Sequence, residues 1–175
     1  FTSLDPKYMV DQLETLKKAY DFEDLNFQDE TFFTYKEDIL KMAELLINRG
    51  LKFTWAATMR ADQGSRMTFE DFELLKKSGL RRLLIGVESG SQEMMDWLKK
   101  DIKMEQVWLC AERCAKLGID VIFPFIVGFP GESDASVEKS MQMAKKLRSM
   151  SSGFDTPIFY FKPYPCSTIT QEVVK

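Results

Sequence analysis

The sequence predicts an α/β fold in which parallel strands form part of a TIM-like barrel. Strand-like and helix-like apolar patterns alternate along the 175 residues, and such alternation is typical of a parallel sheet covered by helices. The predicted strands begin at Leu25, Lys52, Leu83, Ile119 and Pro157. Their intervals of roughly 27 to 38 residues match the length of a βα unit. A complete eight-unit barrel needs about 250 residues, so we expect a partial barrel that forms a single domain over residues 1–175.

The elements of the first half are predicted mainly from capping residues. Asp5 suits the N-cap of the first helix because a proline follows it. A short strand over 25–28 comes next, and Thr34 begins the second helix as the first residue of a capping box. A strand over 52–57 follows, and Thr68 is expected to cap the third helix.

The elements of the second half are predicted from apolar runs and periodicity. Residues 83–87 form a continuous apolar run, which is typical of a strand covered on both faces. A helical pattern over 92–116 is expected to break near Asp101. A strand over 119–127, a further helix and a strand over 157–161 complete the chain.

Polar residues or glycines follow every predicted strand. In parallel α/β folds the ligand site lies at the carboxyl ends of the strands, so these residues would converge on one rim. The carboxylates of Asp29, Glu30 and Glu88 and the guanidinium of Arg60 would suit a small ligand bearing both charges, such as an amino acid. Solvated loops give the same pattern, and Ser89 beside Glu88 also fits a helix-capping role. Spacing alone leaves both interpretations open.

A Gly-Phe-Pro-Gly-Glu turn that begins at Gly128 has two interpretations as well. Glycine directly after a buried strand lets a planar ligand approach the backbone closely. An ordinary strand-to-helix turn, with Ser133 or Asp134 capping the next helix, explains the same residues.

Composition excludes several classes of function. With 24 basic and 27 acidic residues the net charge is −3, which argues against a nucleic-acid partner. Histidine is absent, which excludes Ser-His-Asp and Cys-His catalysis within this chain. No apolar stretch is long enough for a membrane span and no signal peptide is visible, so a cytoplasmic location is expected.

The three cysteines do not form a disulfide framework. Cys110 and Cys114 are four residues apart and resemble a metal pair. They also lie on one apolar helical stripe, where free cysteine packs as a small hydrophobic side chain, and we favour this interpretation. Cys166 stands alone, so no metal ligand is predicted in this chain.

Six segments together resemble the radical S-adenosylmethionine (SAM) superfamily. They share its order of motifs and its strand context, and they cover essentially the whole chain. The segments are 27–30, 55–62, 75–79, 84–91, 125–132 and 163–165. The combination is most similar to the branch that often carries an upstream cobalamin-binding domain, which includes methyltransferases and cyclases of tetrapyrrole and lipid pathways.

The resemblance implies a partial (β/α)6 barrel with SAM bound across the carboxyl ends of its strands. The implied cofactor-binding residues are Asp29, Glu30, Arg60, Glu88, Ser89, Ile126, Val127, Gly128 and Phe129, and none is a catalytic acid or base. Asp29 and Glu30 would approach the methionine amino group, and Arg60 would pair with the methionine carboxylate. Glu88 would contact the ribose or the methionyl part, and the backbone of 126–129 would lie alongside the adenine.

One motif of this family is absent from the chain. The family holds a 4Fe–4S cluster through a CxxxCxxC motif after its first strand, and no such motif occurs here. The first βα unit is therefore expected to be largely missing, and this fragment alone is expected to be inactive. The strand edge left unpaired would favour self-association.

The resemblance implies a function for the intact protein. It would generate a 5′-deoxyadenosyl radical for methyl transfer or another C–H functionalisation, on a small-molecule substrate such as a lipid or tetrapyrrole. Cobalamin is a candidate further cofactor. Two alternatives remain: a non-catalytic, barrel-derived module that binds a ligand or a protein, and an unrelated barrel enzyme with Glu88 or Glu132 as general base.

Overall fold

A computed structural model describes residues 3–165 and 167–173 of the chain. Strands and helices alternate along most of it, as predicted. The strands are β1 (Asp24–Asn26), β2 (Thr54–Thr58), β3 (Leu80–Leu84), β4 (Asp120–Ile122), β5 (Phe125–Val127), β6 (Phe154–Asp155) and β7 (Ile158–Tyr160). The helices are α1 (Pro6–Tyr20), α2 (Lys36–Asn48), α3 (Ala61–Ser65), α4 (Phe69–Lys77), α5 (Gln92–Trp97), α6 (Met104–Leu117), α7 (Asp134–Met150) and α8 (Thr168–Val173).

All the strand pairs are parallel, which confirms the predicted α/β fold. The main sheet has the order β1-β2-β3-β4-β6, and β5 pairs with β7. The two sheets continue one another, because Ile85 N donates to Ile122 O at 2.9 Å and Glu88 forms a parallel bridge with Phe125. The described strands form an open sheet and not a closed barrel.

Two predicted strands, those over 83–87 and 119–127, differ in detail from the structure. The ladder of β3 begins at Leu80, three residues before the predicted start at Leu83. The prediction that 83–87 is covered on both faces is wrong at Leu84, whose side chain is 39% exposed. The strand predicted over 119–127 is divided into β4 and β5 by Pro124, which has no N–H to donate to a ladder. The strand predicted over 157–161 is confirmed as β7.

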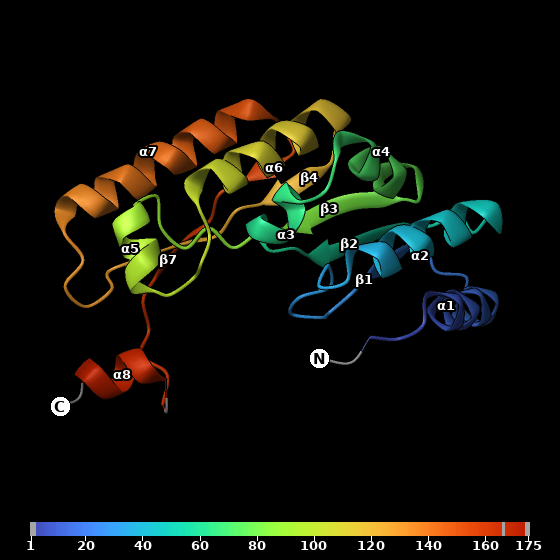
Figure 1. Cartoon of the computed structure of the whole chain (residues 1–175), viewed down its shortest axis with the longest axis horizontal. Helices are drawn as coiled ribbons and strands as arrows, with labels where there is room; N and C mark the ends of the chain where they lie inside the picture. Colours follow the sequence, from blue (N-terminus) through green and yellow to red (C-terminus); the bar gives the residue numbers. More distant parts are fainter. Residues whose placement is uncertain (1–2, 166, 174–175) are drawn as a thin grey trace.

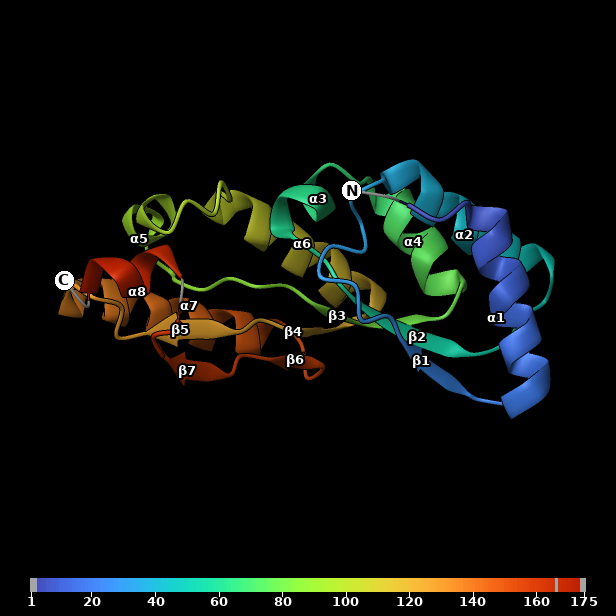
Figure 2. The same cartoon turned by 90° about the horizontal axis from the view of Figure 1, so that it is seen from below.

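Helices cover one face of the sheet and leave the other open. Figure 1 shows α4, α6 and α7 above the strands, whereas α8 stands apart below them. In the view from below, strands β1 to β7 run across the length of the molecule (Figure 2). None of the helices in 3–165 and 167–173 is long and apolar enough to cross a membrane.

The core between sheet and helices is rich in aromatic side chains. Trp55 of β2 is fully buried and packs with Phe27, Phe32 and Phe33, whose ring centroids lie 5.8 to 6.5 Å from its own. Its Nε1 donates to Ser78 O at 3.2 Å. This cluster joins β2 to the loop after β1 and to the end of α4. It therefore fixes the elements that carry the predicted site residues Asp29, Glu30 and Arg60.

Most of the predicted helix caps are present. Asp5 accepts from Tyr8 N, and Thr68 forms a capping box with Asp71. The prediction for Thr34 is wrong, because its hydroxyl donates to Thr31 O in the preceding turn and α2 begins two residues later, at Lys36.

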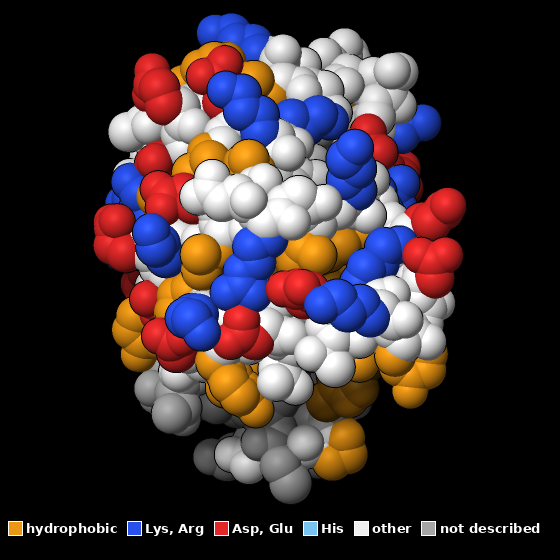
Figure 3. Space-filling model, turned by 90° about the vertical axis from the view of Figure 1, so that its right-hand side faces the viewer, with side chains coloured by type: hydrophobic (Ala, Val, Ile, Leu, Met, Phe, Trp, Pro, Cys, Tyr) orange, Lys and Arg blue, Asp and Glu red, His pale blue; other side chains and the backbone are white. Residues whose placement is uncertain are grey.

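The face at the right-hand end of the molecule has mixed charge. Lysines and arginines are interspersed there with aspartates and glutamates (Figure 3). The salt bridges from Arg49 to Asp11 and Glu14 illustrate this mixture of opposite charges. On this face the surface therefore has no continuous basic patch of the kind that would bind a phosphate backbone.

Candidate functional site

The centre of the candidate site is Glu88, which follows β3. Its backbone is in the left-handed region, with φ +65°, and is fixed on both sides: Glu88 N donates to Pro124 O, and Glu88 O accepts from Ile126 N at 2.7 Å. Its side chain is only 16% exposed. A Cβ at Gly86 would lie 2.8 Å from Glu88 Oε1, so glycine at that position leaves space for the carboxylate.

Lys100 joins Glu88 to Arg60. Its Nζ lies 2.8 Å from Glu88 Oε1, and its backbone carbonyl accepts from Arg60 Nη2 at 2.9 Å. Arg60 Nε also donates to Asp62 at 2.9 Å, which orients the guanidinium at the start of α3. The structure therefore brings together two predicted site residues, and it does so through a lysine that the sequence analysis did not identify.

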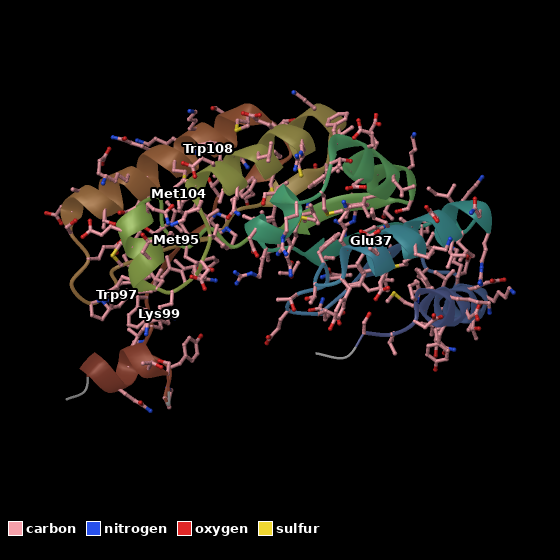
Figure 4. The ribbon with its side chains drawn as sticks, in the orientation of Figure 1. Glu37, Met95, Trp97, Lys99, Met104 and Trp108 are labelled. Carbon is pink, nitrogen blue, oxygen red and sulfur yellow. The ribbon has the colours of Figure 1, made fainter. Side chains whose placement is uncertain are left out.

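The loop between α5 and α6 has an unusual backbone on both sides of Lys100. Lys99 and Asp101 have φ values of +54° and +52°, a region that residues other than glycine rarely adopt. Figure 4 places Trp97 and Lys99 at the end of α5, directly before Lys100. The predicted break near Asp101 is confirmed, and it was the only sequence signal that pointed to this loop.

Ser89 is directed into the fold. Its side chain is fully buried, its Oγ lies 3.2 Å from Ser140 Oγ on α7, and it accepts from Ser91 N. Gly90 N donates to the same Ser140 hydroxyl at 2.9 Å. Ser89 is not the cap residue of the next helix, because the N-cap of α5 is Ser91; its contacts instead hold the loop after Glu88 against α7.

The turn at Gly128 is closed by Glu132. One oxygen of this carboxylate accepts from Gly128 N at 2.6 Å and from Phe129 N at 3.2 Å. Gly128 has φ +81°, a conformation that strongly favours glycine. The two N–H groups are already bonded, so this turn would meet a ligand through its apolar surface.

The surface beside this turn is aromatic. The Phe129 ring lies 5.1 Å from the Phe161 ring and 6.2 Å from that of Trp97, between centroids. Val127 O accepts from Phe161 N, which joins the end of β5 to the segment after β7. Ile126, bonded to Glu88 through its backbone, connects this surface to the Glu88 carboxylate.

Asp29 and Glu30 lie apart from this group. Both are exposed in the loop after β1, and both line two cavities, of about 400 and 500 Å³. Within 3–165 and 167–173, no hydrogen bond or ion pair connects them to Arg60, Lys100 or Glu88. The predicted site is thus divided into a bonded group and an acidic loop.

Cys110 and Cys114 are core residues, as favoured from the sequence. Both are fully buried on α6, and burial raises the pKa of the Cys110 thiol to about 12 and that of Cys114 well above its ordinary value. Among the residues described, no group of three or more acidic, cysteine or histidine residues could hold a metal ion. These residues therefore do not fit a 4Fe–4S cluster, whose ligands are thiolates. Cys166 lies outside the described residues.

The buried thiols lead to a first prediction. Iodoacetamide at pH 8 is expected to leave Cys110 and Cys114 unmodified in the folded protein, because the reactive thiolate is suppressed and the sulfur is inaccessible. Both should react fully in denaturant, as measured by peptide mass spectrometry. Rapid labelling of either residue under native conditions would contradict the core assignment.

Comparison with known proteins gives a family-model match and two similar relatives. The model described as Radical SAM superfamily matches residues 1–144. An uncharacterized methyltransferase of Pyrococcus horikoshii is 27% identical over 141 residues, which are 79% of this chain and 30% of that protein. Anaerobic magnesium-protoporphyrin IX monomethyl ester cyclase of Rubrivivax gelatinosus is 27% identical over 169 residues, which are 97% of this chain and 30% of the cyclase. The chain thus spans about 30% of the length of both relatives.

A solved structure supports the fold. The radical S-adenosylmethionine methyltransferase TsrM from Kitasatospora setae, with cobalamin and a [4Fe-4S] cluster bound, superimposes with a TM-score of 0.76. The match covers 96% of this chain and 31% of that chain at 17% sequence identity. This likeness confirms the arrangement of helices and parallel strands.

Proposed function

The chain belongs to the radical SAM superfamily, and we propose that it forms the SAM-binding part of a longer enzyme. Members of this family bind SAM and a 4Fe–4S cluster, and its cobalamin-bound members include the neighbour of known structure. The observation that carries the proposal is the Arg60–Lys100–Glu88 group, which lies at the carboxyl ends of β2 and β3. In parallel α/β folds this is the edge at which ligands bind.

The residues of this group have the charges that SAM requires. Arg60 can pair with the methionine carboxylate, and Glu88 can accept hydrogen bonds from the ribose hydroxyls or the amino group. The aromatic surface formed by Phe129 and Phe161 suits the adenine. Asp29 and Glu30 would contribute negative charge from the loop after β1. The role of this chain is binding, orientation and exclusion of water.

The chemistry of the intact enzyme would come from the bound cofactors. With a reduced cluster, SAM supplies a 5′-deoxyadenosyl radical for methyl transfer or another C–H functionalisation. The described residues hold no cluster ligands, so those would come from a part of the enzyme outside them. The relatives named above suggest a small-molecule substrate, of which a tetrapyrrole is one class.

The whole protein that contains this chain, purified without oxygen, tests the proposal. We expect about four irons per chain after reconstitution and an electron paramagnetic resonance signal that changes when SAM is added. Absence of iron and of SAM binding would refute the enzyme and favour the alternative of a non-catalytic binding module.

Lys100 leads to a second prediction. Lys100→Met is expected to weaken SAM binding by roughly three- to tenfold, because Glu88 loses the charge that orients its carboxylate. Lys100→Arg should restore most of the affinity, and equilibrium dialysis with labelled SAM measures both. Tighter binding by Lys100→Met would show instead that Lys100 competes with SAM for Glu88.

A further inference from the structure

The start of β3 carries a β-bulge that directs two arginines to the same side. Trp55 of β2 pairs with Leu80 and the next residue, Ala56, pairs with Arg82, so Arg81 is the extra residue. Leu80 and Leu83 on either side are buried in the core. Regular alternation would place one arginine among the helices, whereas the bulge leaves both on the open face of the sheet.

A cavity of about 500 Å³ lies on this open face. Its lining includes both arginines and polar and apolar side chains of all four neighbouring strands: Asn26, Arg81, Arg82, Thr58, Leu84 and Ile122. The acidic loop residues Asp29 and Glu30 form another part of its wall. The cavity therefore has a positive and a negative part, with apolar surface as well.

The two arginines differ in how far their charge is neutralised. Arg81 donates to both carboxylate oxygens of Asp24, and this guanidinium lowers the pKa of Asp24 to about 2. Arg82 has only an ion pair with Asp120, at 3.7 Å between Nη2 and Oδ2, and its side chain is 45% exposed. Within the described residues its guanidinium forms no hydrogen bond, so its donors can bind an anion.

We propose that Arg82 binds the carboxylate of an otherwise apolar substrate on the open face of the sheet. This inference rests on the proposed function, because the substrate would be that of the radical reaction. Arginine binds a carboxylate through two parallel hydrogen bonds, which fixes both position and orientation. A group of higher charge, such as phosphate, would be opposed by Asp29, Glu30 and Asp120 in or beside the same cavity.

Position along β3 defines the length of this substrate. Arg82, Leu84 and Gly86 lie on the open face, because Leu83, Ile85 and Val87 between and after them are buried in the core. Glu88 lies six positions after Arg82, so at most about 20 Å separates them, at roughly 3.3 Å per residue of extended chain. Leu84 pairs with Ile122 of β4, and both side chains line the cavity between the two ends. A ligand held by Arg82 would place its apolar body over these residues, with its far end toward Glu88.

A matched pair of probes tests the subsite in the whole protein that contains this chain. The fluorescent acid 4-(1-pyrenyl)butyrate and its methyl ester share an apolar body and differ in the carboxylate. Arg82→Gln is expected to weaken binding of the acid by about tenfold and to leave the ester unchanged. Asp120→Asn, which removes the competing carboxylate, should tighten binding of the acid by up to about fivefold.

The controls separate this inference from the proposed function. Arg66→Gln, at the C-cap of α3 and outside the cavity, should change neither probe's affinity. Equal binding of acid and ester by the unmodified protein, or an Arg82→Gln variant that loses both equally, would overturn the subsite. SAM binding is measured on the same preparations: a protein that binds SAM without discriminating the probes refutes the subsite alone, and one that discriminates them without binding SAM refutes the proposed function alone.

Discussion

Glu88→Gln is expected to weaken SAM binding by the whole protein by roughly ten- to a hundredfold. The substitution preserves shape and removes the charge, so each hydrogen bond that the side chain accepts falls from about 1.5–3 kcal/mol for a charged acceptor to about 0.5–1.5 kcal/mol for a neutral one. It also leaves Lys100, whose Nζ is 2.8 Å from Glu88 Oε1, without its partner. Isothermal titration calorimetry under anaerobic conditions measures the loss.

The control for this variant is Glu112→Gln. Glu112 is exposed on α6, and replacing it with glutamine makes the same chemical change outside the candidate site. The affinity of the Glu112→Gln variant for SAM should equal that of the unmodified protein. If Glu88→Gln bound SAM equally well, the Glu88 carboxylate would be no part of the cofactor site, and the ion pair with Lys100 would serve only to hold the α5–α6 loop.

The general position of the SAM site could be predicted from the sequence, whereas the contacts among Arg60, Lys100 and Glu88 could not. Glu88 and Arg60 follow apolar runs that read as strands, and parallel strands end at a common edge. Lys100 comes from the interruption between two helices, where Lys99 and Asp101 adopt positive φ values. The sequence around Lys99 and Asp101 does not predict these positive φ values. The contacts of Lys100 with Arg60 and Glu88 could therefore be found only from the structure.

The β-bulge at Arg81 shows the same limit in a strand. The sequence Leu-Arg-Arg-Leu at 80–83 lacks the alternation of a strand, and the strand was predicted only from Leu83, where a continuous apolar run begins. In the structure the extra residue restores the alternation, with both leucines buried. A break in periodicity beside a predicted strand was the available signal. Leu84 is exposed because it lies on the open face of the sheet. An apolar run in the sequence does not indicate whether one or both faces of its strand are covered.

Trp55→Ala is expected to have the largest effect on stability, a loss of about 3–5 kcal/mol in the free energy of unfolding. The indole is fully buried among Phe27, Phe32 and Phe33, and its removal leaves a cavity and deprives Ser78 O of a donor. Urea denaturation followed by circular dichroism measures the change.

Trp97→Ala is the matched control, because Trp97 is 42% exposed at the end of α5 and packs with Phe129. It should lose roughly 1 kcal/mol or less, since surface truncations away from the core cost little. Its effect is expected on SAM binding instead, through the aromatic surface beside Gly128. Comparable losses of stability in the two variants would mean that the α5 end belongs to the core. The contrast follows from the fold itself: Trp55 holds β2 in register so that Arg60 reaches the rim, while Trp97 lies on the rim and contributes little to holding the sheet together.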